Sequence, residues 1–430
     1  MPLVYYAYIA LTWLFLPFIW IFLKWRLAKG REEAGRLKER RGYASAPRPE
    51  GKLIWFHAAS VGEVNSILPL IEDFLAHIKT TQMPVSILLT SGTTTSAQIL
   101  ARKNISGVLH QYVPVDQSLF VRRFLNHWRP DLAVFVESEI WPNLLRYLHK
   151  RATPTVLINA RMSEKSFATW KRMPGSIQRL LGYFDSILAQ DEFSETRLLN
   201  LGARNLQTPG NLKLDSPPPN FDAQMLAQLK TLIGQRPVWL AASTHQGEEE
   251  QIARTHKTLS VDIPDLLTII VPRHPHRGGD IQQSLKPFGL TTKLRSQNQQ
   301  PDEDCALYIA DSLGELGLFY SLCPVSFIGG SLVPHGGQNP IEAALIGSAI
   351  ITGPYHQNFA AVYRHFLEAE AVFKIADNIE LTSILNRLMK NPQLVETMQS
   401  KALNSCAQHG GARQKTLAHL IKKINQQEGA

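Results

Sequence analysis

The sequence predicts an α/β protein made of two doubly wound domains, and three observations support this fold class. Strand-like apolar runs alternate with amphipathic helical segments from residue 43 onward, as they do in parallel sheets covered by helices. The run SPPPN at residues 216–220 interrupts the alternation, because consecutive prolines prevent both helix and sheet hydrogen bonding. The length of 430 residues also exceeds an ordinary domain of ~100–200 residues.

The alternation places the individual elements. In the first half, strands are expected at residues 53–57, 85–90, 107–113, 132–137, 155–159, 186–189 and 206–208, and helices at 63–79, 95–104, 118–127, 141–151, 176–183 and 193–201. In the second half, strands are expected at residues 238–242, 266–271, 290–293, 306–309, 325–328, 349–352 and 372–375, with helices between them. This pattern predicts an N-terminal segment over residues 1–42, a first domain over 43–215 and a second over 216–430. The last helix is a candidate to pack back on the first domain.

Composition narrows the class of protein further. A content of 44% hydrophobic and 19% charged residues is that of a core-forming chain, which excludes wholesale disorder and collagen-like repeats. The three cysteines, Cys305, Cys323 and Cys406, are too few for a disulfide framework and form no Cys-x-x-Cys pair that could hold zinc. This cysteine usage indicates a reducing compartment.

The positive charge is concentrated beside an apolar N-terminal run. Residues 3–23 form 21 residues without a charged side chain, enough at ~1.5 Å per residue to cross a hydrocarbon core of ~30 Å. Residues 24–42 then hold eight basic and three acidic side chains, and so five of the nine net positive charges. Because the basic residues follow the apolar run, we expect an uncleaved anchor with the rest of the chain in the cytoplasm.

Two modes of membrane attachment fit this segment. A transmembrane helix fits its length, whereas its tyrosines, its tryptophans and Pro17 fit a helix that lies in the membrane interface. A buried core helix fits less well, because the basic residues 24–42 follow at once and suit anionic lipid head groups. Beyond Arg41 the basic residues are scattered, without a stripe interleaved with aromatic side chains, so no nucleic-acid partner is expected.

The two predicted domains begin alike. WFHAASVGE at residues 55–63 and WLAASTHQGE at residues 239–248 each give a strand, Ala-Ala-Ser and a Gly-Glu pair that opens a helix. The similarity predicts two similarly built domains that face each other across a cleft.

Four residues of the first half are candidates for chemistry. Glu63 follows a strand and a Ser-x-Gly turn, where strand ends face the ligand crevice of an open sheet. It suits a general base, and capping of its own helix is an equally good structural explanation. Glu137 and Glu139 end another strand and point the same way on an extended segment, and a cap or ion pair explains one of them better than both. Lys213 precedes the linker and either stabilises negative charge or points to solvent.

The second half has two candidate anion sites. Arg273 ends an apolar strand and suits a phosphate or a carboxylate. The neighbouring His274 and His276 lack a third ligand, so a metal is not expected there. Two glycine pairs within residues 329–337 lead into a helix whose N–H groups suit a phosphate, with Glu342 one turn in for ribose hydroxyls. Ordinary turns are the alternative, and neither GxGxxG nor a P-loop is present.

Nine short motifs stand in order along the chain. They are HAASVGE (57–63), ESEIWPN (137–143), NARMS (159–163), GNLKLD (210–215), ASTHQGEE (242–249), VPRHPHR (271–277), GELGLFY (314–320), FIGGSL (327–332) and GGQNPIEA (336–343). Together they resemble the 3-deoxy-D-manno-octulosonic acid (Kdo) transferases of lipopolysaccharide assembly. The resemblance covers essentially the whole chain, and the ordered set is far more specific than any one motif.

The resemblance implies a two-domain GT-B glycosyltransferase on the inner face of the inner membrane. It implies transfer of Kdo from CMP-Kdo to the lipid A precursor with inversion, without a metal or other cofactor at the catalytic site. Matched by motif, the general base falls on Glu63 and two transition-state stabilisers on Glu137 and Lys213. The implied CMP contacts are Pro272, Arg273, Leu313, Gly314, Glu315, Asn339, Pro340, Ile341 and Glu342.

Most of these residue types suit the implied chemistry. Glu63 would remove a proton from the acceptor hydroxyl, while Lys213 and Arg273 would stabilise charge on the departing CMP and on the sugar acid. A negative charge at Glu137 would not by itself stabilise a transition state that gains negative charge. Glu137 would instead orient a partner or carry a proton. One rival interpretation is another GT-B enzyme, such as a heptosyltransferase or a nucleotide-sugar epimerase. The other is an inactive membrane-tethered scaffold, against which the joint presence of Glu63, Lys213 and Arg273 argues.

Overall fold

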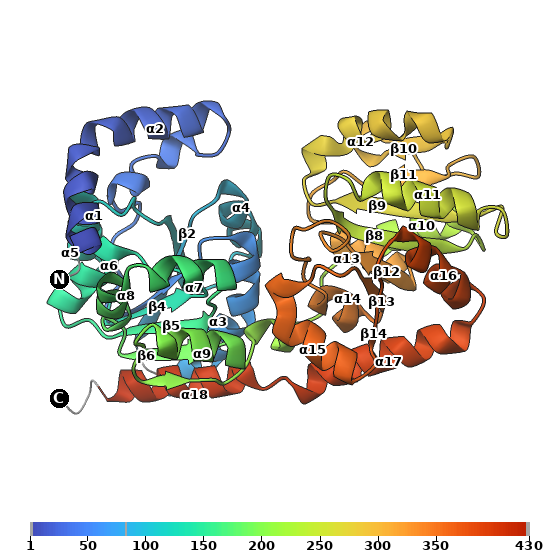
Figure 1. Cartoon of the computed structure of the whole chain (residues 1–430). Helices are drawn as coiled ribbons and strands as arrows, with labels where there is room; N and C mark the ends of the chain where they lie inside the picture. Colours follow the sequence, from blue (N-terminus) through green and yellow to red (C-terminus); the bar gives the residue numbers. More distant parts are fainter. Residues whose placement is uncertain (1–2, 82–83, 427–430) are drawn as a thin grey trace. The chain divides into compact units, whose positions relative to one another are not determined.

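The computed structural model describes residues 3–81 and 84–426 and shows two compact units (Figure 1). The first unit contains the chain up to Ser216 together with the segment from Gly410 onward, and the second contains Pro217–His409. Each unit holds one seven-stranded parallel sheet with helices packed on it. The predicted class of two α/β domains is therefore confirmed.

The sheet of the first unit has the strand order β3-β2-β1-β4-β5-β6-β7. Its strands are β1 (Lys52–His57), β2 (Val85–Ser91), β3 (Val108–Tyr112), β4 (Leu132–Val136), β5 (Thr155–Ala160), β6 (Ser186–Ala189) and β7 (Leu206–Gln207). The direction in which strands are added reverses between β1 and β4, which pair directly. Ligands bind at such a switch point in open α/β sheets, because the loops leaving the two strands diverge there.

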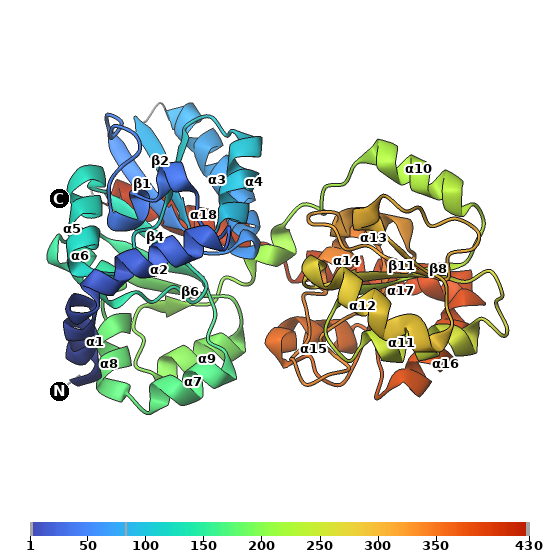
Figure 2. The same cartoon turned by 90° about the horizontal axis from the view of Figure 1, so that it is seen from above.

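Helices cover both faces of this sheet (Figure 2). They are α3 (Val61–Thr81), α4 (Thr94–Lys103), α5 (Ser118–Trp128), α6 (Pro142–Lys150), α7 (Glu164–Lys171), α8 (Pro174–Leu181), α9 (Glu192–Asn200) and α18 (Ala412–Asn425). Alternate residues of β1 serve the two cores, since side chains of a strand point to opposite faces. Trp55 packs among α5, α6 and α8, whereas Phe56 packs among α3, α4 and α18.

The second unit repeats this construction with the strand order β10-β11-β9-β8-β12-β13-β14. Its strands are β8 (Val238–Thr244), β9 (Leu267–Pro272), β10 (Thr292–Leu294), β11 (Leu307–Ile309), β12 (Val325–Ile328), β13 (Ala349–Thr352) and β14 (Val372–Lys374). Its helices are α10 (Ala223–Ile233), α11 (Glu249–Leu259), α12 (Gly278–Leu285), α13 (Leu316–Leu322), α14 (Ile341–Ile346), α15 (Ala360–Glu368), α16 (Asn378–Met389) and α17 (Pro392–Gln408). The strand β8 pairs with β12, as β1 pairs with β4 in the first unit.

The C-terminal helix α18 belongs to the first unit, where it packs against α3. The carboxylate of Asp215 accepts hydrogen bonds from the backbone N–H groups of Gly411 at 2.6 Å and Arg413 at 2.7 Å, at the start of this helix. The Arg413 side chain also pairs with Asp73 of α3 at 3.0 Å. The described part of residues 410–430 therefore belongs to the first unit. The sequence had assigned these residues to the second domain, with only the last helix expected to pack on the first.

The apolar N-terminal run forms two helices instead of one. α1 (Leu3–Leu14) and α2 (Leu16–Ala28) meet at Phe15 with a bend of 71°. Pro17 lies in the first turn of α2, where its missing N–H costs no intrahelical hydrogen bond. Within residues 3–81 and 84–426, no single helix is long and apolar enough to cross a membrane, and these two helices reach that length and composition only as a bent pair. The apolar run 3–23 is thus divided between two helices, where a single anchor helix was expected.

The basic residues 24–42 fold against the first unit instead of forming a separate segment. Buried Glu32 pairs with Arg26 at 2.7 Å and with Arg40 at 2.9 Å, and buried Glu39 pairs with Arg36 at 2.8 Å. Three of the eight basic side chains are therefore neutralised within the protein. The Arg40 guanidinium also donates to the carbonyl oxygens of Gly92 at 2.6 Å and Val113 at 3.2 Å, so the segment is joined to the first unit and no boundary is observed at residue 42.

Candidate active site

Glu63 lies in the first turn of α3, after the loop that leaves β1. Its carboxylate accepts hydrogen bonds from the backbone N–H of Ala59 at 2.7 Å and from the hydroxyl of Ser60 at 2.9 Å. The Ser60 oxygen accepts one in turn from the Glu63 N–H at 3.3 Å. The helix-capping arrangement expected as the structural explanation is therefore present, and the side chain is only half-buried.

The proton affinity of Glu63 is unusually high for a carboxylate. Burial, and then the negative charges of Glu137 and Glu139, raise the pKa of Glu63 to about 7, against the opposing effect of the hydrogen bonds from Ala59 and Ser60. A carboxylate with this pKa exchanges a proton readily near neutral pH. Glu63 thus combines the position and the proton affinity of a general base.

Glu137 follows β4 and forms an ion pair with Lys213, whose Nζ lies 2.6 Å from Glu137 Oε1. The backbone of Glu137 is left-handed, with φ at 59°, a conformation that is uncommon for residues other than glycine. Its N–H donates to the carbonyl oxygen of Ile158, and its own carbonyl oxygen accepts from the N–H of Arg161. The end of β5 therefore holds this turn in a conformation of the kind that clusters at ligand sites.

Lys213 belongs to a short 3-10 helix, Leu212–Asp215. The Asn159 side chain accepts a hydrogen bond from the Leu212 N–H at 3.1 Å, and the Asn211 side chain accepts one from the Lys213 N–H at 3.0 Å. These contacts direct Lys213 to a carboxylate 76 residues earlier in the chain. The structure thus brings Glu137 and Lys213 together, which their spacing in the sequence did not reveal.

Sequence reasoning missed His57, the last residue of β1. Its ring is fully buried, with Nε2 3.2 Å from Glu139 Oε2 and Nδ1 3.0 Å from the Thr90 hydroxyl. The Trp141 indole N–H donates to the same Glu139 oxygen at 2.5 Å. Burial opposes ionisation of Glu139, but the contacts with His57 and Trp141 outweigh it and lower the pKa. The signal was available, since His57 begins the motif that contains Glu63.

In the second unit, Arg273 directly follows Pro272, the last residue of β9. Its guanidinium is exposed and forms no hydrogen bond or ion pair with residues 3–81 or 84–426. The neighbouring Arg277 differs, because it pairs with Glu249 at 2.9 Å. Arg273 is therefore the arginine of this loop that is accessible to a ligand anion.

The histidines beside Arg273 lie on the same surface loop. His274 and His276 are exposed, with ring centroids 5.8 Å apart. In the described part of the chain, no group of three or more His, Cys, Asp or Glu side chains is arranged to hold a metal ion.

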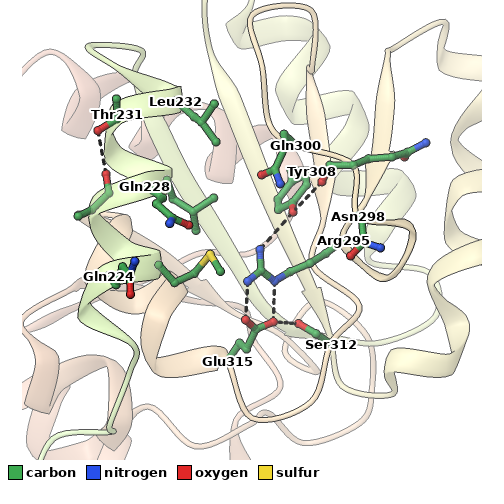
Figure 3. A pocket seen from close by; sticks show the side chains of 14 residues that line it. Gln224, Gln228, Thr231, Leu232, Arg295, Asn298, Gln300, Tyr308, Ser312 and Glu315 are labelled. Carbon is green, nitrogen blue, oxygen red and sulfur yellow. Dashed lines mark hydrogen bonds and ion pairs between the residues drawn. The ribbon is translucent and has the colours of Figure 1, made fainter.

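Leu313, Gly314 and Glu315 end the loop between β11 and α13. Gly314 is left-handed with φ at 84°, and the Leu313 side chain is 74% exposed. Glu315 pairs with two guanidinium nitrogens of Arg295 and accepts a hydrogen bond from the Ser312 hydroxyl (Figure 3). Burial opposes ionisation of Glu315, but these contacts outweigh it and lower the pKa. The Glu315 side chain therefore fixes the loop to Arg295 and Ser312 and is itself occupied. The loop backbone and the Leu313 side chain are accessible to a ligand.

A pocket of about 840 Å³ borders this loop (Figure 3). From α10, the apolar side chains of Met225, Leu229 and Leu232 line the pocket together with Gln224 and Gln228. Arg295 and Tyr308 lie across from Leu232, beside Asn298 and Gln300. The volume is within the range of ~300–1,000 Å³ typical of small-molecule sites. A preformed cavity therefore adjoins some of the residues implied to bind CMP.

The remaining implied CMP contacts, Asn339, Pro340, Ile341 and Glu342, lie at the start of α14. The Asn339 side chain accepts a hydrogen bond from the Ile341 N–H at 3.2 Å. Burial and the nearby Glu342 carboxylate raise the pKa of Tyr320. In this structure the Ile341 N–H is therefore paired with the side chain two residues earlier.

The fold and the strand-end residues define a GT-B protein, the two-unit α/β class of many nucleotide-sugar enzymes. The structure is similar to UDP-GlcNAc 2-epimerase from Neisseria meningitidis, with a TM-score of 0.61 and 13% identity over 86% of this chain and 100% of that chain. It is also similar to a glycosyltransferase from Rickettsia africae ESF-5, with a TM-score of 0.58 and 11% identity over 87% of this chain and 99% of that chain. At these identities the similarity shows the fold alone.

Sequence comparison identifies the family within this class. A family model described as 3-deoxy-D-manno-octulosonic-acid transferase (kdotransferase) matches residues 35–216. The chain is 36% identical to the probable mitochondrial 3-deoxy-D-manno-octulosonic acid transferase of Arabidopsis thaliana, over 94% of this chain and 93% of that protein. It is 33% identical to the 3-deoxy-D-manno-octulosonic acid transferase of Haemophilus influenzae, over 96% of this chain and 97% of that protein. The chain belongs to the Kdo transferase family of glycosyltransferases, as its nine motifs indicated.

Proposed function

We propose that the chain transfers Kdo from CMP-Kdo to the lipid A precursor with inversion, as a step of lipopolysaccharide assembly. The acceptor hydroxyl oxygen forms a bond to the anomeric carbon of Kdo while the bond from that carbon to the phosphate oxygen of CMP breaks. The hydroxyl proton passes to Glu63, and the bonding electron pair leaves with CMP. Family membership supports the reaction class, and the surroundings of Glu63 support the mechanism.

The observation that carries the mechanism is the environment of Glu63. Its carboxylate lies at the switch point of the first sheet, is half-buried, and has a pKa raised to about 7 by burial and by two neighbouring carboxylates. A general base works best when its pKa is near the operating pH. An ordinary helix cap with a typical pKa would be a poorer base for a sugar hydroxyl.

Glu137 and Lys213 have complementary roles in this proposal. The Lys213 ammonium stabilises negative charge that develops during transfer. Glu137 orients that ammonium through the 2.6 Å ion pair, and its charge adds to the proton affinity of Glu63. This explains the anion at Glu137 through its partners: it positions one cation and tunes one base.

We assign CMP to the strand ends of the second unit. The exposed guanidinium of Arg273 suits a phosphate, because it can donate two parallel hydrogen bonds. The loop of Leu313 and Gly314, beside the pocket, suits the rest of the nucleotide. We propose no metal or cofactor for this step, since the Arg273 guanidinium supplies positive charge for the phosphate of the leaving CMP.

The decisive experiment is mass spectrometry of products formed by the purified chain from CMP-Kdo and a lipid A precursor. A product heavier by one or more Kdo units is expected. If the enzyme binds CMP but forms no product, the proposal that the lipid A precursor is its acceptor is refuted. Tighter binding of UDP or ADP than of CMP would instead favour another GT-B enzyme, such as an epimerase or a heptosyltransferase.

We also propose that α1 and α2 attach the chain to the cytoplasmic face of the inner membrane by lying in its interface. Tyr5 and Leu23 are buried in the first unit, and the Tyr8 hydroxyl donates to Asp116 at 3.0 Å. One side of the helix pair is therefore bound to protein, which a helix crossing the bilayer by itself would not be.

The exposed side chains of the helix pair have the composition of an interfacial surface. The apolar side chains among them are Val4, Tyr6, Leu11, Trp13, Leu14, Phe15, Phe18, Trp20, Ile21, Phe22 and Trp25. Exposed Lys24, Lys29, Arg31 and Lys38 follow them. Aromatic side chains beside unshielded cations suit the acyl boundary and anionic head groups of a membrane, and the lipid acceptor resides in that membrane.

A further inference from the structure

Glu248 is a fully buried carboxylate between two loops of the second unit. Its Oε2 accepts hydrogen bonds from the backbone N–H groups of His245 at 2.9 Å and Gly330 at 2.7 Å. Its Oε1 accepts two more, from the N–H groups of Ser331 and Leu332, both at 2.9 Å. One side chain thus satisfies four main-chain donors, three of them in the glycine-rich loop that follows β12.

The four donors require an ionised acceptor. A carboxylate has about four lone-pair positions for hydrogen bonds, whereas a protonated acid or an amide would direct a hydrogen at one of the donors. Burial raises the pKa of Glu248, and the backbone N–H groups oppose that shift. The loop and the carboxylate therefore stabilise each other. The Glu248 charge is not solvated by water and depends on the four N–H groups, and in the described part of the chain these N–H groups have no other acceptor.

The glycine-rich loop in turn supports the segment implied to bind CMP. The Gly337 N–H donates to the Gly330 carbonyl oxygen at 2.7 Å, and the Gln338 N–H donates to the Gly329 carbonyl oxygen at 3.1 Å. The next residues are Asn339 to Glu342. Gly329 also approaches the β8 turn so closely that a Cβ atom there would lie 2.6 Å from the carbonyl oxygen of Ser243. The loop position is thus set from one side by backbone packing and from the other by Glu248.

The first unit has the same Gly-Glu turn with a different outcome. Glu63 follows β1 as Glu248 follows β8. β1 pairs with β4 and β8 pairs with β12, and the loop after β4 or β12 lies next to the Gly-Glu turn of its unit. In the first unit that neighbouring loop contributes carboxylates, Glu137 and Glu139, which raise the pKa of Glu63. In the second unit it contributes N–H groups, which bind the carboxylate. The same turn therefore holds a partly accessible base in one unit and a buried anion in the other.

We propose that Glu248 is a positioning residue for donor binding, which holds the glycine-rich loop, and through it residues 339–342, in the conformation that receives CMP. The inference rests on the proposed function, since it takes CMP as the ligand of that segment. Glu248 does not touch the donor, so it acts on nucleotide affinity and not on proton transfer.

The variant Glu248→Gln tests this role in the full-length protein, because it keeps the shape and directs an NH2 group at the backbone donors. We expect the dissociation constant of CMP, measured by calorimetry, and the KM for CMP-Kdo to rise about tenfold or more. The acceptor KM and the pH midpoint of the reaction should not change. Glu250→Gln, two residues along in α11, removes the same charge and should keep the CMP dissociation constant within about twofold of wild type. A folded Glu248→Gln protein that also stays within that limit would overturn the proposal.

A second measurement applies even where Glu248→Gln does not fold. In the wild-type protein without nucleotide, hydrogen exchange should show the amides of Gly330, Ser331 and Leu332 strongly protected. Glu248→Asp, which keeps the charge but shortens its reach, should accelerate that exchange and weaken CMP binding together. Exchange of these amides in the wild type at the rate of open loops would refute the role of Glu248. A wild-type protein with protected amides that binds no CMP would instead refute the proposed function.

Discussion

Glu63 shows how neighbouring residues convert a helix-capping carboxylate into a candidate base. The hydrogen bonds from Ala59 and Ser60 favour the charged form, while burial and the charges of Glu137 and Glu139 oppose it more strongly. The residues that shift its pKa come from a different strand end, so the proton affinity is a property of the site and not of the turn.

The variant Glu63→Gln is expected to lose about 10²–10⁴-fold in kcat, the usual contribution of a general base. The glutamine still accepts the Ala59 N–H but cannot take a proton from the acceptor. The measurement is steady-state Kdo transfer, with CMP affinity as the control for an intact second unit. Turnover close to wild type would exclude Glu63 as the base.

The pH profile follows from the same pKa. Because the base must be deprotonated, kcat/KM should rise with pH and level off above the Glu63 pKa of about 7. Glu139→Gln removes a negative charge near Glu63, lowers that pKa and should move the midpoint to lower pH. Glu164→Gln, an exposed charge of α7, is the matched control. An unmoved midpoint in Glu139→Gln would contradict the electrostatic coupling.

Arg273→Ala is expected to weaken CMP binding about tenfold or more, because it removes a charge-assisted contact with the phosphate. Isothermal titration with CMP measures the change, and cytidine is the comparison ligand since it lacks the phosphate. If Arg273→Ala and wild type bind CMP equally, Arg273 does not contact the phosphate.

At the scale of elements, the Asp215 side chain caps the start of α18, whose apolar face packs on the first unit. The Asp215 carboxylate accepts hydrogen bonds from the Gly411 and Arg413 N–H groups at the start of that helix. Asp215 lies two residues after Lys213, which pairs with Glu137. A helix end without such an acceptor leaves backbone donors unpaired. Asp215 thus holds the start of the last helix beside the 3-10 helix that contains Lys213.

Asp215→Ala should lower the free energy of unfolding by about 1–2 kcal/mol, the usual cost of a lost N-terminal cap. Urea unfolding followed by circular dichroism measures it. Glu396→Gln, an exposed carboxylate of α17, should leave the unfolding midpoint unchanged. Equal midpoints for Asp215→Ala and wild type would show that α18 is held by its apolar face alone.

At the scale of the whole molecule, the charge of +9 is divided between structural and accessible groups. Arg26, Arg36 and Arg40 are used in ion pairs with Glu32 and Glu39 inside the first unit. In the proposed membrane attachment, the exposed cations near α2 attract anionic lipid and the exposed apolar side chains of α1 and α2 insert. Such attachment would confine the search for a lipid acceptor to two dimensions.

Phe22→Glu should reduce binding to vesicles of anionic phospholipid about tenfold, because it places a charge in the inserted surface. Vesicle flotation measures the bound fraction. Val261→Glu is the matched control, since Val261 is 80% exposed on the second unit. Alkaline extraction of native membranes should release the wild-type protein, and retention after extraction would indicate a true transmembrane helix.

Local patterns predicted most of the secondary structure. Strands β6, β12 and β13 have the bounds expected from their apolar runs, because buried parallel strands are continuously apolar and end at polar turns. The short helix α7 was not predicted, and the break at Phe15 was not either. Both depend on packing: α7 presents Phe167 and Trp170 to the first core, and α1 buries Tyr5 there.

The sequence by itself determined the family, the two α/β domains and the place of Glu63, since these depend on ordered motifs and on patterns within short stretches of chain. Only the tertiary structure decided what surrounds each charge. It joined Lys213 to Glu137 and His57 to Glu139, and it enclosed Glu248 in a loop, across 76 to 82 residues of chain. Hydrogen bonding and proton affinity depend on distance and burial in space, and those quantities exist only once the sheets have formed.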